Sequence, residues 1–499
     1  MEIRDRYAPS PTGLQHIGGL RTALFNYLFA RSAGGTFILR LEDTDRTRYD
    51  PAYEQNLYDT FAWLGLAWDE GPRRGGPSAP YVQSERTGLY RKYAEELLEK
   101  GGAYRCFCTG ERLERVRAER EAARSAETGY DRRCRGLGPE ESARRAAAGE
   151  GFTIRLRIPL EEEPGGGGGP RVTRFTDKLL GDIEWKNADI NPDPVLLKSD
   201  GFPTYHLANV VDDHLMGITH VLRAQEWLSS TPLHVILYRA FGWEPPVFCH
   251  LPMVMGQDGK KLSKRHGATS IDEFRRAGYL PEALLNYVAL LGCSYEEGRD
   301  LYSLAELEAR FSLDRLNKAP AVFDYKKLEW YNGQYIRMKN SEELAALSLP
   351  YAVEGGLFGG GEPGEEQRAL YTAAMGLVRE RANLLPDIPA KLGYLFSDPA
   401  VPPGGELIPK KGGAEGALRS LRLARELIPL LAAADDEEAE RLVKERAEGV
   451  KLGDFLMPLR AALTGARVSP PLFGSIRLLG ARRCLTRIDA ALAALEASR

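Results

Sequence analysis

The sequence has few cysteines, no long apolar run and almost no net charge. Six cysteines among 499 residues are too few for a disulfide framework and favour a reducing, cytoplasmic setting. No stretch approaches the ~18 consecutive apolar residues of a membrane span, and the charged N-terminal segment predicts neither a signal nor a transit peptide. The 67 Lys and Arg residues nearly balance 70 Asp and Glu, for a formal charge of −3. Averaged over the whole chain, this balance argues against a nucleic-acid partner.

The length and composition indicate a globular protein of several domains. At ~100–200 residues per domain, the chain is long enough for three or four domains with their own cores. The 43% hydrophobic and 27% charged content excludes wholesale disorder.

The N-terminal part alternates short apolar strands with amphipathic helices. Strands are expected at 3–8 and 37–39, with a helix at 18–32 between them and further helices at 52–64 and 84–100. A strand, helix, strand order with short links predicts a parallel sheet with a right-handed crossover.

The segment from about 105 to 200 has a different composition and is interpreted as an insertion. It contains three cysteines and, between Pro164 and Pro170, five consecutive glycines, which predict a flexible loop. Residues 152–158 alternate like an exposed antiparallel strand.

Further along, the α/β pattern returns and then gives way to helices. A helix is expected at 205–214, a strand at 218–222 and a second helix from Thr231 to Gly242. After about 320 the chain reads as predominantly helical, interrupted by Gly/Pro-rich breaks at 354–364 and 402–416.

The first chemically informative segment is RYAPSPTGLQHIGGLR, residues 6–21. A strand ends here, and His16 with Gly18 and Gly19 stands where a helix begins. Helix N-termini attract anions, glycines let a phosphate approach the backbone, and a histidine adds a donor. The residues alone leave open a plain loop histidine beside a glycine turn.

The second informative segment is DGKKLSKRHG, residues 258–267. Asp258-Gly259 predicts a tight turn, and four cations follow within seven residues: Lys260, Lys261, Lys264 and Arg265. A mobile cationic loop of this kind suits phosphoryl-group chemistry, and a solvated basic turn is the alternative. Neither segment matches GxxxxGK[ST], which argues against an ordinary P-loop ATPase.

Taken together, the two segments resemble the signatures of class I aminoacyl-tRNA synthetases. HIGG is similar to HIGH, and KLSKR, 245 residues later (261 − 16), is similar to KMSKS. The surrounding segments RYAPSPTG, FNYLFAR, RLEDTDR, FPTYHLANVVDDHLMGITHVLRAQEW and KLSKRHG resemble bacterial-type glutamyl-tRNA synthetase. YLPEALLNYVALLG and KLGDFLMPLRAALTG extend the resemblance over nearly the whole chain.

The resemblance implies an α/β Rossmann-type parallel-sheet catalytic domain with an α+β insertion, followed by an all-α anticodon-binding region. The expected boundaries are 1–104 and 201–250 for the two catalytic halves, 105–200 for an acceptor-end-binding insertion, 251–335 for a stem-contact region with the KLSKR loop, and 336–395 and 396–499 for two anticodon-binding helical subdomains.

The implied reaction joins L-glutamate to the terminal adenosine of tRNA(Glu) through glutamyl-adenylate. ATP with Mg²⁺ is the expected co-substrate, and a cytoplasmic monomer is the family expectation. Because the substrate carboxylate is itself the nucleophile, catalysis can rest on positioning and electrostatic stabilisation. The expected catalytic residues are His16, Gly18, Lys261 and Lys264, which also bind ATP together with Glu226 and Trp227.

The resemblance also implies a glutamate pocket. Arg6 and Arg223 match carboxylate-binding arginines, for which a guanidinium fork is well suited. The other matching positions are Ser10, Glu42, Tyr205 and Asn209, of which the last two are spaced i, i+4 on one helical face. Each of these residues also has a purely structural alternative. Arg6 would form a plain salt bridge with Glu42, Tyr205 would be a core residue, and Trp227 would only pack against its neighbours.

Zinc remains an open question within the insertion. Some relatives hold a structural zinc with three cysteines and a histidine or tyrosine. Here Cys106, Cys108 and Cys134 supply the thiols, and Gly136 stands where the histidine version needs its ligand, which leaves Tyr130 as the fourth. Inert buried thiols are the alternative.

The helical C-terminal third resembles an anticodon-binding region. Between Phe455 and Ile488 the sequence has no Asp or Glu and six arginines, which predict a local basic surface whatever the whole-chain charge: Arg460, Arg467, Arg477, Arg482, Arg483 and Arg487. Positions that match family contacts to the anticodon are Arg460, Ser469, Pro470, Leu472 and Phe473. Phe473 is expected to stack on a base or to belong to the core. Arg381 matches an arginine that disfavours glutamine tRNA, but the residues leave open whether tRNA(Gln) is also charged.

Three rival assignments are less consistent with the sequence. Glutaminyl-tRNA synthetase has a β-barrel anticodon region, whereas residues 330–499 show helical periodicity. A shorter paralogue that glutamylates queuosine in tRNA lacks an anticodon domain. A small-molecule nucleotidylyltransferase with a similar phosphate site has no need of the helical third.

Overall fold

The computed structural model describes residues 2–125, 129–160, 172–401, 403–409, 412–447 and 451–497. The glycine-run loop expected between Pro164 and Pro170 lies outside these residues. The chain forms two compact units, one of Met1–Phe274 with Leu284–Asp324 and one of Arg275–Ala283 with Tyr325–Arg499. The boundary between the units falls inside the expected segment 251–335. The six-segment division stays a prediction.

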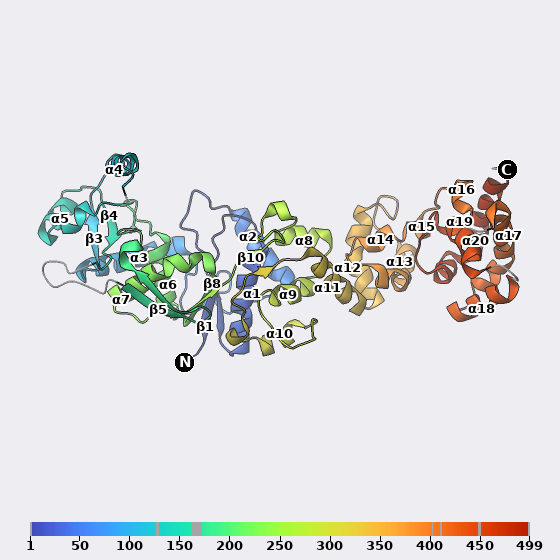
Figure 1. Ribbon diagram of the computed structural model, residues 1–499, viewed down its shortest axis with the longest axis horizontal. Coiled ribbons are helices and arrows are strands. Elements are labelled where there is room, and N and C mark those ends of the chain that lie inside the picture. Colours follow the sequence, from blue (N-terminus) through green and yellow to red (C-terminus); the bar gives the residue numbers. More distant parts are fainter. Residues whose placement is uncertain are drawn as a thin grey trace. The chain divides into compact units, whose positions relative to one another are not determined.

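The first unit opens with the expected strand, helix and strand (Figure 1, blue). Strand β1 (Arg4–Tyr7) leads through a Pro/Gly loop to helix α1 (Ile17–Ser32), and β2 (Thr36–Leu39) pairs with β1 in parallel. Helices α2 (Pro51–Leu64) and α3 (Thr87–Glu99) follow near their expected positions.

A second set of strands lies beside β1. Strand β8 (His220–Ala224) pairs in parallel with β9 (Val247–Leu251), and β5 (Val172–Asp177) and β6 (Gly181–Lys186) continue the sheet in the order β6-β5-β9-β8. Thr219 N, just before β8, donates to Arg4 O at 2.9 Å, so β8 runs alongside β1. The residues at the ends of β1, β8 and β9 therefore face a common edge.

Two helices connect these strands, as the periodicity predicts. Helix α6 (Tyr205–Leu215) precedes β8, and α7 (Thr231–Phe241) ends at Gly242, whose φ of 77° forms the left-handed cap. The strand expected at 218–222 begins two residues later, at His220.

The insertion is built on a three-stranded antiparallel sheet of β3 (Ala103–Cys106), β4 (Thr153–Leu156) and β7 (Val195–Leu197), with helices α4 (Gly110–Ala122) and α5 (Pro139–Ala147). The prediction of an exposed strand at 152–158 was wrong in its exposure. Ile154 and Leu156 are buried, and Arg155 is only 7% exposed. Its guanidinium donates to Asp193 O at 3.0 Å and lies 3.9 Å from the centre of the Tyr130 ring, which compensates for its burial.

The KLSKR loop follows the short strand β10 (Val254–Met255), which pairs with β11 (Ala321–Val322). Helix α10 (Leu304–Arg310) lies in the same unit, and helices α8 (Ile271–Ala277) and α9 (Pro281–Ala289) span the boundaries between the units.

The second unit is helical throughout its described part, as expected (Figure 1, yellow to red). Its helices are α11 (Tyr325–Met338), α12 (Ser341–Glu354), α13 (Glu365–Val378), α14 (Asp387–Ala390), α15 (Gly393–Phe396), α16 (Gly404–Leu407), α17 (Gly413–Leu431), α18 (Asp436–Arg446), α19 (Leu452–Thr464) and α20 (Leu472–Ala497). In the described parts of both units, we find no helix whose length and apolar content suffice to cross a membrane.

Candidate active site

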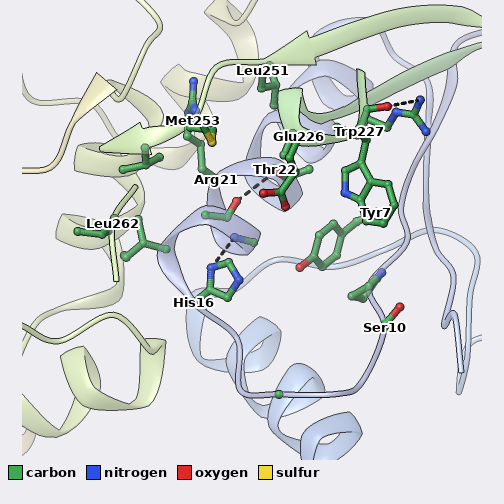
Figure 2. A pocket seen from close by; sticks show the side chains of 18 of the residues that line it. Tyr7, Ser10, His16, Arg21, Thr22, Glu226, Trp227, Leu251, Met253 and Leu262 are labelled. Carbon is green, nitrogen blue, oxygen red and sulfur yellow. Dashed lines mark hydrogen bonds between the residues drawn. The ribbon is translucent and has the colours of Figure 1, made fainter. Parts of the chain in front are cut away.

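A cavity of about 1000 Å³ opens at the edge where β1, β8 and β9 end (Figure 2). All twelve residues that the sequence predicts for catalysis, ATP and glutamate line it: Arg6, Ser10, His16, Gly18, Glu42, Tyr205, Asn209, Arg223, Glu226, Trp227, Lys261 and Lys264. They come from segments up to 258 residues apart (264 − 6), so the fold gathers them. Their individual roles stay predictions.

His16 caps helix α1 and presents its other nitrogen to the cavity. Its φ of −129° is extended, and its Nδ1 accepts a hydrogen bond from Gly19 N at 3.2 Å. Desolvation lowers the pKa of His16, and the charge on Lys261 lowers it further. The imidazole is therefore neutral near pH 7, with its proton on Nε2 and available to an anion.

The surroundings of the two glycines in the HIGG segment leave little room for a side chain. A Cβ on Gly19 would lie 2.9 Å from the hydroxyl of Tyr7, and one on Gly18 would lie 3.2 Å from the ring of His16. Both glycines belong to the first turn of α1 and line the cavity. The N–H groups and the positive dipole end of this turn favour the binding of a phosphate.

The KLSKR loop also lines the cavity. Gly259 has a φ of 72°, as the expected tight turn requires, and Lys261 bridges back to Met255. The ammonium of Lys261 forms an ion pair with Glu226, and Lys264 is exposed at the cavity. Glu226 thus links the loop to the segment that follows β8.

The part of the cavity lined by Arg6 and Glu42 contains a network of buried charges. Arg6 donates to both carboxylate oxygens of Asp213, at 3.0 and 3.3 Å. Arg40 donates to Asp213 at 2.7 Å and to Glu42 at 2.9 Å, and Asn209 donates to Glu42 at 3.1 Å. The alternative prediction of a salt bridge between Arg6 and Glu42 is wrong, because Arg6 pairs with Asp213 and Glu42 pairs with Arg40.

Arg40 and Asp213 were not among the predicted site residues. The signal that could have found Asp213 is the pair Asp212-Asp213 inside an otherwise apolar helix, since buried carboxylates require partners. Burial raises the pKa of Glu42 above its ordinary value although Arg40 and Asn209 oppose this effect.

Tyr205 and Trp227 form an aromatic wall of the cavity. Their ring centroids are 4.6 Å apart, and Trp227 remains 39% exposed. Tyr205 is partly exposed rather than a core residue, and Asn209 lies one turn further along α6. An exposed indole beside a phenol offers a stacking surface for a planar base.

Arg21 is a cavity residue that the sequence did not single out. It is buried, its Nη1 donates to Pro252 O, and its Nε and Nη2 have no hydrogen-bond partner among the described residues. Burial lowers the pKa of Arg21 to about 10. The available signal was its position inside the HIGGLR segment.

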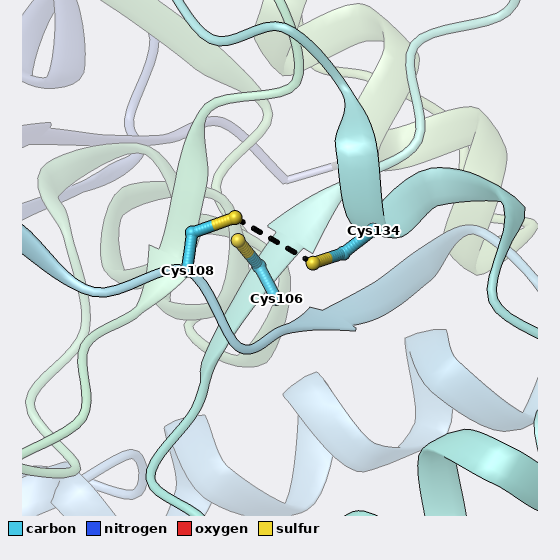
Figure 3. Close-up of side chains that lie close together, drawn as sticks. All are labelled: Cys106, Cys108 and Cys134. Carbon is cyan, nitrogen blue, oxygen red and sulfur yellow. Dashed lines mark hydrogen bonds between the residues drawn. The ribbon is translucent and has the colours of Figure 1, made fainter. Parts of the chain in front are cut away.

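The three cysteines of the insertion point toward one another (Figure 3). Their Sγ atoms all lie within 4.8 Å, with Cys108 and Cys134 at 3.6 Å. The Tyr130 hydroxyl is 3.3 Å from Cys106 Sγ and 3.8 Å from Cys108 Sγ. Tetrahedral zinc with Zn–S bonds of about 2.3 Å places its sulfurs about 3.7 Å apart, so this donor set fits the metal.

Two guanidiniums accompany the cysteine cluster. Arg112 Nη1 lies 3.3 Å from Cys108 Sγ, and Arg155 lies over the Tyr130 ring. Burial raises the pKa of Cys108 to about 11, and the neighbouring Cys106 adds to this effect. The cationic surroundings would favour thiolates bound to zinc.

In the second unit, a smaller cavity of about 310 Å³ gathers part of the predicted anticodon set. Arg381, Ser469 and Pro470 line it, and Arg381 and Arg460 both donate to Ser469 O. Leu472 is 4% exposed, and neither it nor the partly buried Phe473 lines this cavity.

The basic surface expected between Phe455 and Ile488 stays a prediction, with Arg467, Arg477 and Arg482 exposed and Arg487 buried. Five of its six arginines bind main-chain carbonyls or carboxylates of their own unit: Arg460, Arg467, Arg477, Arg483 and Arg487. Arg487 is buried and binds Leu463 O at the end of α19, a carbonyl that the helix itself leaves unpaired. Counting arginines could not reveal that these groups stabilise helix ends.

Comparisons with known proteins agree with this geometry. The family described as tRNA synthetases class I (E and Q), catalytic domain, matches residues 2–330, and an anticodon binding domain matches residues 343–492. A glutamate–tRNA ligase of Treponema denticola is 58% identical, covering 99% of both chains. One of Borreliella burgdorferi is 48% identical over 98% of both.

A solved structure of a glutamate–tRNA synthetase has a similar fold. A glutamate–tRNA synthetase of Elizabethkingia anophelis superposes with a TM-score of 0.84 at 34% identity, covering 99% of this chain and 100% of that one.

Proposed function

The chain belongs to the class I tRNA synthetase family of the E and Q type, and we propose that it ligates L-glutamate to the 3′-terminal adenosine of tRNA(Glu) for translation. The observation that carries this proposal is the single cavity in which a helix N-terminus with His16, the KLSKR lysines and a glutamate-sized set of charged groups meet. We propose that it acts as a monomer in the cytoplasm.

In the first step, a carboxylate oxygen of glutamate forms a bond to the α-phosphorus of ATP. The bond from that phosphorus to the bridging oxygen breaks, and pyrophosphate leaves. Negative charge develops on the phosphoryl oxygens, where His16 Nε2–H, the N-terminal N–H groups of α1, Lys261 and Lys264 are placed to stabilise it. Mg²⁺ accompanies ATP and offsets phosphate charge.

In the second step, a ribose hydroxyl of the terminal adenosine attacks the activated carbonyl, and AMP leaves. The products are glutamyl-tRNA, AMP and pyrophosphate. Both steps use the substrates' own nucleophiles, so the pocket needs positioning and charge stabilisation rather than a nucleophilic side chain. Trp227 offers a stacking surface for adenine, and Tyr205, expected at the glutamate, packs against its ring.

Glutamate presents two carboxylates and an ammonium, and the cavity offers matching charges. Arg6 and Arg223 suit the carboxylates, and Ser10, Glu42 and Asn209 suit the ammonium and the remaining oxygens. Breaking of the Lys261–Glu226 ion pair would free Lys261 for the phosphates when ATP enters.

For the cysteine cluster, we propose a structural zinc held by Cys106, Cys108, Cys134 and Tyr130. The sulfur spacings in the insertion support it. We expect one zinc per chain after exhaustive dialysis and none in Cys134→Ser, with Cys484→Ser in the other unit as control. Metal well below one per chain in the parent protein would remove this proposal.

The function is tested by aminoacylation with every pairing of glutamate or glutamine with tRNA(Glu) or tRNA(Gln). We expect glutamyl-tRNA(Glu) in the presence of ATP and Mg²⁺, and no glutaminylation. Failure to charge either tRNA with glutamate would overturn the proposed function.

A further inference from the structure

Arg223 is held in the cavity wall by uncharged groups only. Its Nη2 donates to Thr231 Oγ1 at 2.7 Å, its Nη1 to the Tyr205 hydroxyl at 3.2 Å and its Nε to His250 Nε2 at 3.0 Å. Further acceptors are Trp227 O at 3.3 Å and His234 Nδ1 at 3.4 Å. Within the described residues, no carboxylate pairs with this guanidinium.

The other arginines at this end of the cavity differ in that respect. Arg6 pairs with Asp213, and Arg40 pairs with Asp213 and Glu42. Because Arg223 is only 5% exposed, its charge is both desolvated and without a direct counterion. A substrate carboxylate would supply that counterion.

The position and protonation of His250 follow from the sheet. Arg223 on β8 and His250 on β9 are register partners, so their side chains project from the same face of neighbouring strands. Asp177, the last residue of β5, lies on the other side and approaches His250 Nδ1 to 2.6 Å with Oδ2.

Asp177 fixes the tautomer of His250. Its carboxylate accepts from the backbone N–H groups of Leu179 at 3.0 Å, Leu180 at 2.9 Å and His250 at 3.1 Å. Burial raises the pKa of Asp177, but the bond from His250 and these backbone bonds outweigh burial and leave the pKa below its ordinary value. An ionised acceptor requires the proton on His250 Nδ1, which leaves the lone pair of Nε2 for Arg223.

The same reasoning extends to two further histidines. His234 Nδ1 faces Arg223 and therefore accepts, so its proton lies on Nε2 and is donated to His206 Nδ1 at 3.1 Å. Burial lowers the pKa of His206 to about 4, and it also lowers the pKa of His234. The imidazoles around Arg223 are thus neutral and cannot serve as its counterion.

We propose that His250 and Asp177 are positioning residues for substrate specificity. Asp177 holds His250 as the neutral Nδ1–H tautomer, and His250 holds Arg223 in place without neutralising it. The guanidinium then retains a full charge for the side-chain or α-carboxylate of the amino acid. This inference rests on the proposed function, because it takes glutamate as the ligand at this end of the cavity.

The inference predicts a specific pH dependence. Four charged or titratable groups surround His250: Asp177 on β5, Arg223 on β8, His234 on α7 and Arg6 on β1. Burial lowers the pKa of His250, Arg223 lowers it further, and Asp177 opposes them. Above that pKa the glutamate KM should be constant. Below it, Nε2–H would face the Arg223 N–H, and the KM should rise as the pH falls.

Two variants distinguish the effect of the His250 tautomer from the effect of losing the His250 side chain. In Asp177→Asn the amide N–H₂ competes for the Nδ1 side and favours a proton on Nε2, where it opposes Arg223. We expect the KM for glutamate to rise about tenfold or more, as for loss of a hydrogen bond to a charged group, with the KM values for ATP and tRNA unchanged. His250→Gln places an untitratable carbonyl near the position of Nε2. Its KM for glutamate should therefore lie below that of Asp177→Asn, and its acid rise should be smaller than that of the parent protein, with Glu42 as the other titrating group of the pocket.

The experiment measures the three KM values, kcat and melting temperature of the full chain between about pH 5 and 8. His214→Gln, which removes an exposed ring stacked on Trp243 outside the cavity, is the matched control. Glutamylation by the parent protein tests the proposed function separately. An unchanged glutamate KM in Asp177→Asn, an equal rise in the KM for ATP, or an acid rise in His250→Gln as large as that of the parent protein would overturn the inference.

Discussion

We propose that His16 acts through both of its nitrogens, and a pair of variants can separate the two roles. Nδ1 accepts from Gly19 N and caps α1, while Nε2–H faces the cavity. His16→Ala should lower the rate of adenylate formation by about 10²–10³, as for loss of one transition-state donor. It should also cost about 0.5–2 kcal/mol of stability through the lost cap.

The matched variant His16→Asn keeps a capping acceptor but lacks the donor at Nε2. We expect it to recover the melting temperature and not the rate of tRNA-dependent glutamyl transfer at saturating substrates. Recovery of both would assign His16 to capping alone.

At this residue scale, the motifs located the cavity but not the partners that orient its charges. His16 and Lys261 belong to local patterns that a single sequence displays. Asp213 lies 207 residues from Arg6, and Asp177 lies 73 residues from His250. Such pairs depend on which strands become neighbours, and local periodicity contains no information about that.

At the scale of elements, helix α1 is built to approach its neighbours closely. Gly19→Ala would push a methyl group against the Tyr7 hydroxyl, which donates to Gln15 Oε1 at 2.9 Å. We expect lower stability, since a lost buried hydrogen bond costs about 1–3 kcal/mol and the gain in helix propensity is about 0.5–1 kcal/mol.

Gly88→Ala in helix α3 is the control, because nothing lies within 4 Å of the added methyl group. It should raise the free energy of unfolding in urea by about 0.5–1 kcal/mol through helix propensity. If both alanine variants were equally stabilised, the close approach at Gly19 would have no energetic role.

The elements themselves were largely predictable because their signals are local. Pro51 after the capping Asp50 begins α2, and Gly65 with a φ of 70° ends it. The burial of β4 was not predictable from its alternating pattern. The pattern predicts that Arg155 faces solvent, whereas in the fold its guanidinium lies over the Tyr130 ring and donates to Asp193 O.

At the scale of the whole molecule, net charge is a poor guide to the partner. The formal charge of −3 argues against a nucleic-acid partner. The arginines between Phe455 and Ile488, by contrast, predict a local basic surface. Most of those arginines bind carbonyls and carboxylates of their own unit. Bonds to carbonyls leave the guanidinium charge in place, and Arg467, Arg477 and Arg482 remain exposed, so the basic surface stays a prediction. The other support for tRNA comes from the cavity of the first unit, the cavity beside Arg381 and the full-length relatives.

Arg381 allows a test of tRNA choice by the whole chain. It lines the smaller cavity of the second unit together with Ser469 and Pro470. We expect Arg381→Gln to raise glutamylation of tRNA(Gln) relative to tRNA(Glu), because a guanidinium at this position would no longer oppose the unfavoured base. Lys391→Gln, at the same cavity, is the control for a general loss of charge. An unchanged ratio of kcat/KM values for the two tRNAs would contradict the role given to Arg381.

The central claim is that one cavity binds glutamate and ATP end to end. The most direct test is a crystal structure with a non-hydrolysable glutamyl-adenylate analogue. We predict the glutamyl carboxylate within hydrogen-bonding distance of Arg6 or Arg223, the phosphate analogue beside His16 Nε2 and Lys261, and adenine near Trp227. An analogue bound in the reverse direction, or outside this cavity, would contradict the account.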